Sequence, residues 1–287
     1  MKFAREVHEV YQQAYAMATR SLTKAKKQGL PVCPVALNTL MEERMISYHL
    51  DLGVMDIPTN LIVGVTEGTE KSSLYSKDFF PVSVPKSKFA DQWRDLYRQC
   101  FSEEGLPGHI RCYEYLGKFY VADGLKRVSV AKYHKAHMIK SQVIRIMPIR
   151  TESKSIQQYY EFLFHFRLTR LYQIQFTQQG YFEKFQAALG YEPTYKWTDA
   201  DRSQFLAVWP KIEYAFYKSY DEYLYITAAD ALVVLLEKYP YEQITQMESW
   251  TLARIFQTFW KEFYALSFPD FKLGRKQHKS AEALQTA

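Results

Sequence analysis

One stretch constrains the fold more than any other: Tyr120–Lys132 changes from a strand pattern to a helix pattern within two residues. The apolar run before Asp123 suits a strand, and the run after Gly124 suits a helix. Gly124 can take a positive φ angle and allow another backbone or a ligand to come close, while Asp123 can cap the new helix through its carboxylate. We therefore expect any chemistry of this chain to lie at this junction.

Two cations follow the glycine. Lys126 and Arg127 fall in the first helical turn, where each opposes the helix dipole by roughly 0.3–1 kcal/mol unless an anion is bound there. The pattern predicts a phosphate or other anion site formed by Asp123, Gly124, Lys126 and Arg127. An Asp-Gly turn that opens a helix is also common without any ligand, in which case the two cations simply face water.

The segments around the junction alternate between helix and strand. Their apolar spacing predicts a helix over Ser87–Ser102, an edge segment from Val54 interrupted by Pro58, and strands over Leu61–Val65, Ile110–Leu116, Lys118–Ala122 and Met138–Met147. Such a mixture predicts a compact α+β unit. The polar stretch Thr66–Asp78 is interpreted as a mobile loop, either a lid over the junction or a surface excursion.

Helices are predicted before this unit. Lys2–Gln28 has apolar residues at spacings of three and four and ends at Gly29, and Val35–Leu50 has a similar apolar stripe. The predicted organisation is N-terminal helices over residues 1–52, a mixed domain over 53–150, and a mainly helical domain over 151–287.

The order of these elements resembles the ParB/sulfiredoxin superfamily. The resemblance rests on a helix, a Glu-Glu-Gly-Leu-Pro turn at Glu103–Pro107, the strand pair, the Tyr120–Lys132 stretch and a closing strand, and it covers roughly Asp56–Arg150. It implies a loop that holds a nucleotide phosphate, of CTP in ParB proteins, ATP in sulfiredoxin and ADP in the related free-serine kinases. By this likeness Gly124 and Arg127 hold the phosphate, and Asp123 matches the aspartate of the kinases' Asp-Gly-His-His-Arg version.

The residues after the glycine depart from each relative. Leu125 stands where sulfiredoxins carry a reactive cysteine, so the resemblance does not extend to that activity. ParB proteins carry Glu-Arg-Arg there, and Leu125-Lys126-Arg127 loses the carboxylate but keeps two cations. The two histidines of the kinase version are replaced by Leu125 and Lys126. Binding of a phosphate is therefore better supported than catalysis, and Lys126 could contact it as a point charge.

The region after Arg150 is rich in aromatic residues, with 31 of the chain's 47, which predicts a second core. Predicted helices are Ile156–Leu168, Tyr181–Leu189, Thr198–Tyr220, Ala228–Tyr239 and Glu248–Leu266. Thr198, with Asp199 and Asp201 after it, starts the third of these, Pro210 kinks or divides it, and Thr227 caps the fourth. Thr227–Glu262 could form a DNA-binding helix-turn-helix, but its aromatic residues favour a packing face. The basic tail Lys272–Lys279 is typical of a solvated end.

Composition excludes some classes of protein. Three cysteines, Cys33, Cys100 and Cys112, have no CxxC spacing, which argues against a disulfide framework or zinc site. No apolar run approaches the roughly 18 residues of a membrane span, so we expect a cytoplasmic protein without a membrane partner. A net charge of +6 and a pI near 8.9 permit nucleic-acid or nucleotide binding without requiring it.

Three functions remain open from the sequence. The first is a regulatory or DNA-associated module that binds a nucleotide or other phosphate ligand, with CTP, ATP or ADP plus Mg²⁺ as candidates. The second is a phosphotransferase in which Asp123 handles Mg²⁺ or a substrate hydroxyl and Glu67 or Glu70 is the base, provided that their loop folds inward. The third is a non-catalytic scaffold for protein interaction. DNA and a second copy of the chain are the other candidate partners, and no metal site is assigned.

Overall fold

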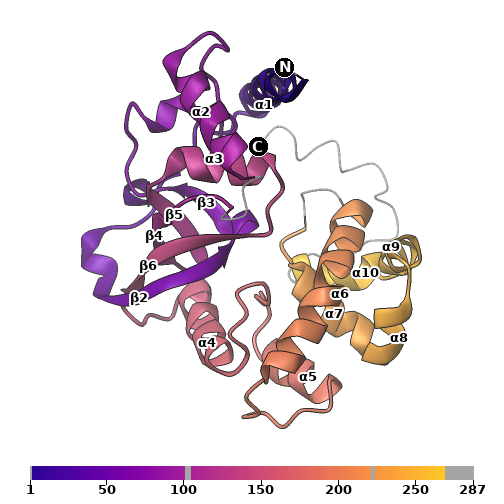
Figure 1. Cartoon of the computed structure of the whole chain (residues 1–287). Helices are drawn as coiled ribbons and strands as arrows, with labels where there is room; N and C mark the ends of the chain where they lie inside the picture. The colour runs from indigo at the N-terminus through magenta and orange to yellow at the C-terminus, as the bar shows by residue number, and fades with distance from the viewer. Residues whose placement is uncertain (1, 101–104, 221–223, 269–287) are drawn as a thin grey trace. The chain divides into compact units, whose positions relative to one another are not determined.

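The computed structural model describes residues 2–100, 105–220 and 224–268 and divides the chain into two compact units, Met1–Gln157 and Gln158–Ala287 (Figure 1). The first unit combines helices with a β-sheet, and the helices of the second form their own core. The chain is thus of the mixed α and β class that the sequence predicts. Within the described residues, no helix is both long and apolar enough to cross a membrane.

Six strands form one mixed sheet among the described residues, in the order β1-β3-β5-β4-β6-β2. Their bounds are β1 Val35–Ala36, β2 Ile46–Pro58, β3 Ile62–Val65, β4 Ile110–Tyr115, β5 Lys118–Asp123 and β6 Met138–Pro148. Strands β4 and β5 form the predicted hairpin, because Leu116 and Gly117 both take positive φ angles, 50° and 75°, as a tight hairpin turn requires. β5 therefore lies inside the sheet, and its end opens directly into the next helix.

The prediction of a second helix over Val35–Leu50 is wrong. This stretch contains β1, two short 3₁₀ turns and the first part of β2, which pairs antiparallel with β6 along the sheet edge. Its apolar stripe does not all reach the core, since Leu37 is buried but Tyr48 is 52% exposed. Pairing with a strand some ninety residues away outweighs the local helical spacing. Pro58 ends β2 as expected.

The helices of the first unit, α1 Lys2–Lys27, α2 Lys88–Gln99 and α3 Leu125–Tyr133, lie side by side on one side of the sheet (Figure 1). α1, α2 and α3 confirm predicted helices to within a few residues. Each helix contributes a buried residue to a shared apolar cluster: Tyr11 from α1, Trp93 from α2 and Val130 from α3. The resulting contacts fix the position of α3, which begins at the predicted junction.

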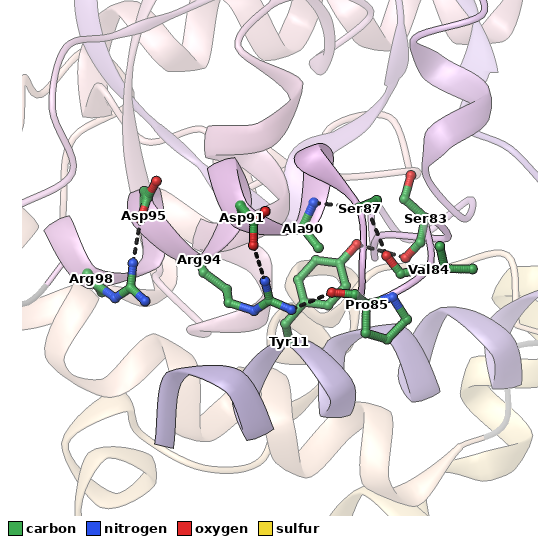
Figure 2. Close-up of polar contacts among 10 residues, drawn as sticks. All are labelled: Tyr11, Ser83, Val84, Pro85, Ser87, Ala90, Asp91, Arg94, Asp95 and Arg98. Carbon is green, nitrogen blue, oxygen red and sulfur yellow. Dashed lines mark hydrogen bonds and ion pairs between the residues drawn. The ribbon is translucent and has the colours of Figure 1, made fainter. Parts of the chain in front are cut away.

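Polar contacts join α1 and α2 to the segment that precedes α2 (Figure 2). The buried Arg94 lies 5.1 Å from the centre of the Tyr11 ring, with its guanidinium bonded to Asp91 at 2.7 Å and to the Pro85 carbonyl at 2.5 Å. The Tyr11 hydroxyl donates to the Ser83 carbonyl at 2.8 Å. α2 is therefore held at its first turns, and it can serve as a fixed support for α3.

Helix α4, Lys154–Thr169, begins in the last residues of the first unit and continues into the second. The other helices of the second unit are α5 Tyr181–Ala188, α6 Asp199–Ser219, α7 Ala228–Leu236, α8 Tyr241–Gln246, α9 Ser249–Thr258 and α10 Trp260–Ser267. Thr198 and Thr227 cap α6 and α7 as predicted, each in a reciprocal capping box. α6 runs through Pro210 without being divided, because its buried residues on either side hold it against the core.

The last predicted helix, Glu248–Leu266, is instead two helices that meet at Phe259. The aromatic packing face is confirmed for Phe256, Phe259 and Phe263, which are buried, but it is wrong for Trp250 and Trp260, which are 64% and 41% exposed. α7 is buried along nearly its whole length, which suits packing better than DNA reading. The tail Lys272–Lys279 lies outside the described residues, as do Glu103 and Glu104 of the predicted turn.

Candidate functional site

The β5–α3 junction has the geometry that its glycine predicts. Gly124 has a φ of +96° and lies so close to β4 that a Cβ atom there would meet Cγ2 of Ile110 at 2.6 Å. Real Cβ contacts do not come this close, so both the backbone angle and the packing require glycine. The chain passes from strand to helix through this single residue.

Asp123 does not cap the helix, contrary to expectation. Gly124 itself is the N-cap of α3, and no side chain caps this helix among the described residues. Asp123 is the last residue of β5 and is exposed, with the exposed Arg111 as its register partner on β4. The first peptide N–H groups of a helix have no partner within the helix. The start of α3 therefore keeps its positive dipole end without a carboxylate cap.

Arg127 is held against the loop before β4. Its Nε donates to the Pro107 carbonyl at 2.9 Å, and its guanidinium lies beside Gly108, whose added Cβ would be 3.5 Å from one terminal nitrogen. Since Nε is occupied by a neutral carbonyl, the charge of the guanidinium remains uncompensated by this contact. Among the described residues, the terminal nitrogens of Arg127 have no hydrogen-bond partner, so Arg127 is positioned at the junction with donors left for a ligand.

Lys126 points toward α2. Its Nζ donates to Oε1 of Gln92 and lies 5.2 Å from the centre of the Phe89 ring. Partial burial lowers the pKa of this ammonium. The structure therefore brings Gly124 and Arg127 together at the junction, whereas the second predicted cation is engaged by the neighbouring helix.

A buried hydrogen bond fixes α3 behind the junction. Trp93 Nε1 donates to Oγ of Ser129 at 2.9 Å, and both side chains are fully buried. The hydroxyl that the sequence places one turn into the helix therefore has a structural partner. Its role is to hold α3 on α2.

The loop that carries the two predicted carboxylates leaves β3 beside the end of β5, where Thr66 N donates to the Val121 carbonyl at 3.0 Å. Glu67 and Glu70 are exposed, and no contact in the described part of the chain directs either carboxylate into the junction. The predicted loop is not wholly irregular, because it contains a 3₁₀ turn at Ser72–Leu74, and both Ser72 and Tyr75 are buried. The lid remains a prediction. Among the described residues, no three His, Cys, Asp or Glu side chains are grouped as metal ligands.

A second polar group, which the sequence does not indicate as a site, lies near the other end of α3. Lys132, Lys77 and Asp78 line a cavity of about 330 Å³ together with Asn60 and apolar residues. The sequence gives one indication that Lys132 is buried. It follows Val128 and Ser129 by four and three residues, so it lies on the same face of the helix as these buried side chains.

Comparisons with known proteins add no family assignment. No protein-family model matches the chain, and a search of curated proteins finds no match.

Proposed function

We propose that the β5–α3 junction binds the phosphate of a nucleotide, and that the first unit is a ParB/sulfiredoxin-like binding module. The proposal depends on the start of α3, where Gly124 is left-handed, no described side chain caps the helix, and Arg127 lies beside it. Helix N-termini of this kind bind anions through their N–H groups and dipole. The order of strand pair, glycine, helix and closing strand supports the same interpretation.

The residues at the junction suit binding. In this proposal the backbone after Gly124 and the guanidinium of Arg127 contact the phosphate, and Lys126 adds positive charge from its place beside Gln92. Arg111, exposed opposite Asp123, adds a further cation. The carboxylate of Asp123 repels a bare phosphate but attracts Mg²⁺, so a nucleotide with Mg²⁺ is the better ligand. A regulatory or DNA-associated role follows from the resemblance alone.

Calorimetric titration with CTP, ATP and ADP, each with Mg²⁺, tests the binding. Arg127→Met is expected to weaken binding roughly tenfold to a hundredfold, since a hydrogen bond to a charged group contributes about 1.5–3 kcal/mol. Arg20→Met is the matched control, because Arg20 is an exposed arginine on α1. If none of the three nucleotides binds, or if the control weakens binding equally, the junction is not a phosphate site.

The exposed Asp123 favours one alternative, a nucleotide-dependent phosphotransferase in which this carboxylate handles Mg²⁺ or a substrate hydroxyl. Asp123→Ala would then abolish nucleotide turnover while leaving the fold intact. Turnover that survives this change excludes the role. The interaction scaffold is the interpretation that remains if no nucleotide binds, and a salt-dependent gel shift on random duplex DNA examines the DNA partner separately.

A further inference from the structure

The first unit contains a cavity of about 330 Å³ that the proposed nucleotide site does not use. Its apolar wall is formed by residues that follow α1 and by strands of the sheet: Leu30, Pro31, Val35, Ile62 and Val63. Pockets of 300–1,000 Å³ with a mainly apolar lining and a few polar groups are typical of small-molecule sites. This cavity is at the small end of that range.

Lys132 brings a largely buried cation into the cavity. Its Nζ donates to the Ile62 carbonyl at 2.8 Å and lies 5.1 Å from the centre of the Phe79 ring. Burial lowers the pKa of this ammonium to about 8, with the nearby Asp78 acting in the opposite direction. An ammonium has three donors, and the Ile62 carbonyl uses one of them. The other two are available to an acceptor inside the cavity.

A carboxylate and a second ammonium stand beside it. Asp78 accepts from Oγ of Ser21 at 2.5 Å and from Nζ of Lys77 at 2.9 Å. Burial alone would raise the pKa of Asp78, but the hydrogen bonds from Ser21 and Lys77 together lower it, so the group is ionised at neutral pH. Two cations and one anion leave the lining of the cavity with a net charge of +1.

We propose that this cavity binds a small carboxylic acid with an apolar body, its carboxylate on Lys132 and Lys77 and its apolar part against the wall of Val35, Ile62 and Val63. One negative charge neutralises the lining. A phosphate dianion would instead leave an excess negative charge beside Asp78, and a neutral ligand would leave the net charge of +1 in the lining without a counter-charge. The ligand class is therefore a monoanion.

The cavity is separate from the junction proposed for nucleotides. Lys132 is five residues beyond Arg127 on α3, which corresponds to about 7.5 Å along the helix axis. None of the residues proposed to hold the nucleotide lines the cavity. The two proposals can therefore fail independently.

Calorimetry with phenylacetate as the probe tests the carboxylate site, with phenylacetamide as its neutral counterpart and inorganic phosphate as the dianion. We expect phenylacetate to bind at millimolar concentration or below and Lys132→Met to weaken it roughly tenfold or more. Val63→Phe fills the cavity from a partly exposed position and should also abolish binding. Lys140→Met, which changes an exposed lysine on β6, should leave binding unchanged.

Several results would overturn the proposal: no binding of phenylacetate, equal binding of phenylacetamide, stronger binding of phosphate, or full binding by Val63→Phe. If Lys132→Met fails to fold, Lys77→Met replaces it, because the side chain of Lys77 is 33% exposed and its loss removes the second cation. Arg127→Met should bind phenylacetate like the unaltered chain, which separates this site from the nucleotide site.

Discussion

Gly124→Ala tests whether packing as well as backbone conformation fixes the glycine at the junction. An alanine there would have to keep a φ of +96° and place its Cβ atom 2.6 Å from Cγ2 of Ile110. Gly29→Ala is the matched control in the same unit, because Gly29 has a φ of +65° and a Cβ added to it meets nothing within 4 Å. Gly29→Ala therefore has the free-energy cost of an alanine with a positive φ angle but no steric clash of the added Cβ atom.

The expected magnitudes differ accordingly. A left-handed conformation costs a residue with a Cβ roughly 1–2 kcal/mol, which is the whole effect expected for Gly29→Ala. Overpacking adds about 1–3 kcal/mol, so Gly124→Ala should lose about 2–5 kcal/mol. Ile110→Ala in the Gly124→Ala background removes Cγ2, the atom in closest contact, and should relieve part of the clash. It leaves the conformational penalty in place.

Urea denaturation followed by fluorine NMR of 5-fluorotryptophan protein measures these changes in the first unit, since Trp93 is the one tryptophan of Met1–Gln157. Its resonance reports the unfolding of that unit separately from the second. Equal losses for Gly124→Ala and Gly29→Ala would refute the packing argument. The glycine would then be explained by its backbone angle alone.

Two further predictions concern buried charge. Arg145→Met removes the ion-pair partner of Glu114, which is fully buried in the sheet, and should destabilise the first unit by about 3–5 kcal/mol. Changing both residues to apolar ones should recover most of this loss. Equal stability of the single and double variants in urea would contradict this. Burial lowers the pKa of His165 to about 3, whereas an unperturbed histidine has a pKa near 6.5, so the contribution of its neutral ring to the stability of the second unit is complete only above about pH 6.5. The free energy of unfolding should fall by about 2 kcal/mol between pH 7 and pH 5, and His165→Leu should remove this part of the pH dependence. An unchanged pH dependence of urea denaturation in His165→Leu would contradict this prediction.

Features set by neighbouring residues were predictable from the sequence. The Lys118–Asp123 strand, the left-handed glycine and the helix after it all follow from local period and glycine chemistry. The caps at Thr198 and Thr227 were recognisable because a capping box needs only residues three positions apart. The class of fold follows from such elements.

Features set by distant pairing were not predictable. Ile46–Leu50 has residues that suit one face of the predicted Val35–Leu50 helix, but its pairing with β6 makes it the first part of an edge strand, of which only the segment from Val54 was predicted. Asp123 had the chemistry of a cap, yet the left-handed Gly124 takes the N-cap position and leaves the carboxylate outside. Lys132 looked like an ordinary helix residue, because nothing local shows that Asp78 lies close to it.

The partners of the cations distinguish the two ends of α3. Near its C-terminal end, Lys132 has the carboxylate of Asp78 close by, so its charge is partly compensated within the chain. At its N-terminal end, Lys126 and Arg127 bond to an amide oxygen and a peptide carbonyl, which are neutral acceptors. Positive charge beside the positive end of a helix dipole is unfavourable without an anion. An anionic ligand at the N-terminal end would remove that penalty, whereas an anion at the C-terminal end would have to compete with Asp78. We therefore assign the multiply charged phosphate to the N-terminal end of α3 and a single carboxylate to the C-terminal end.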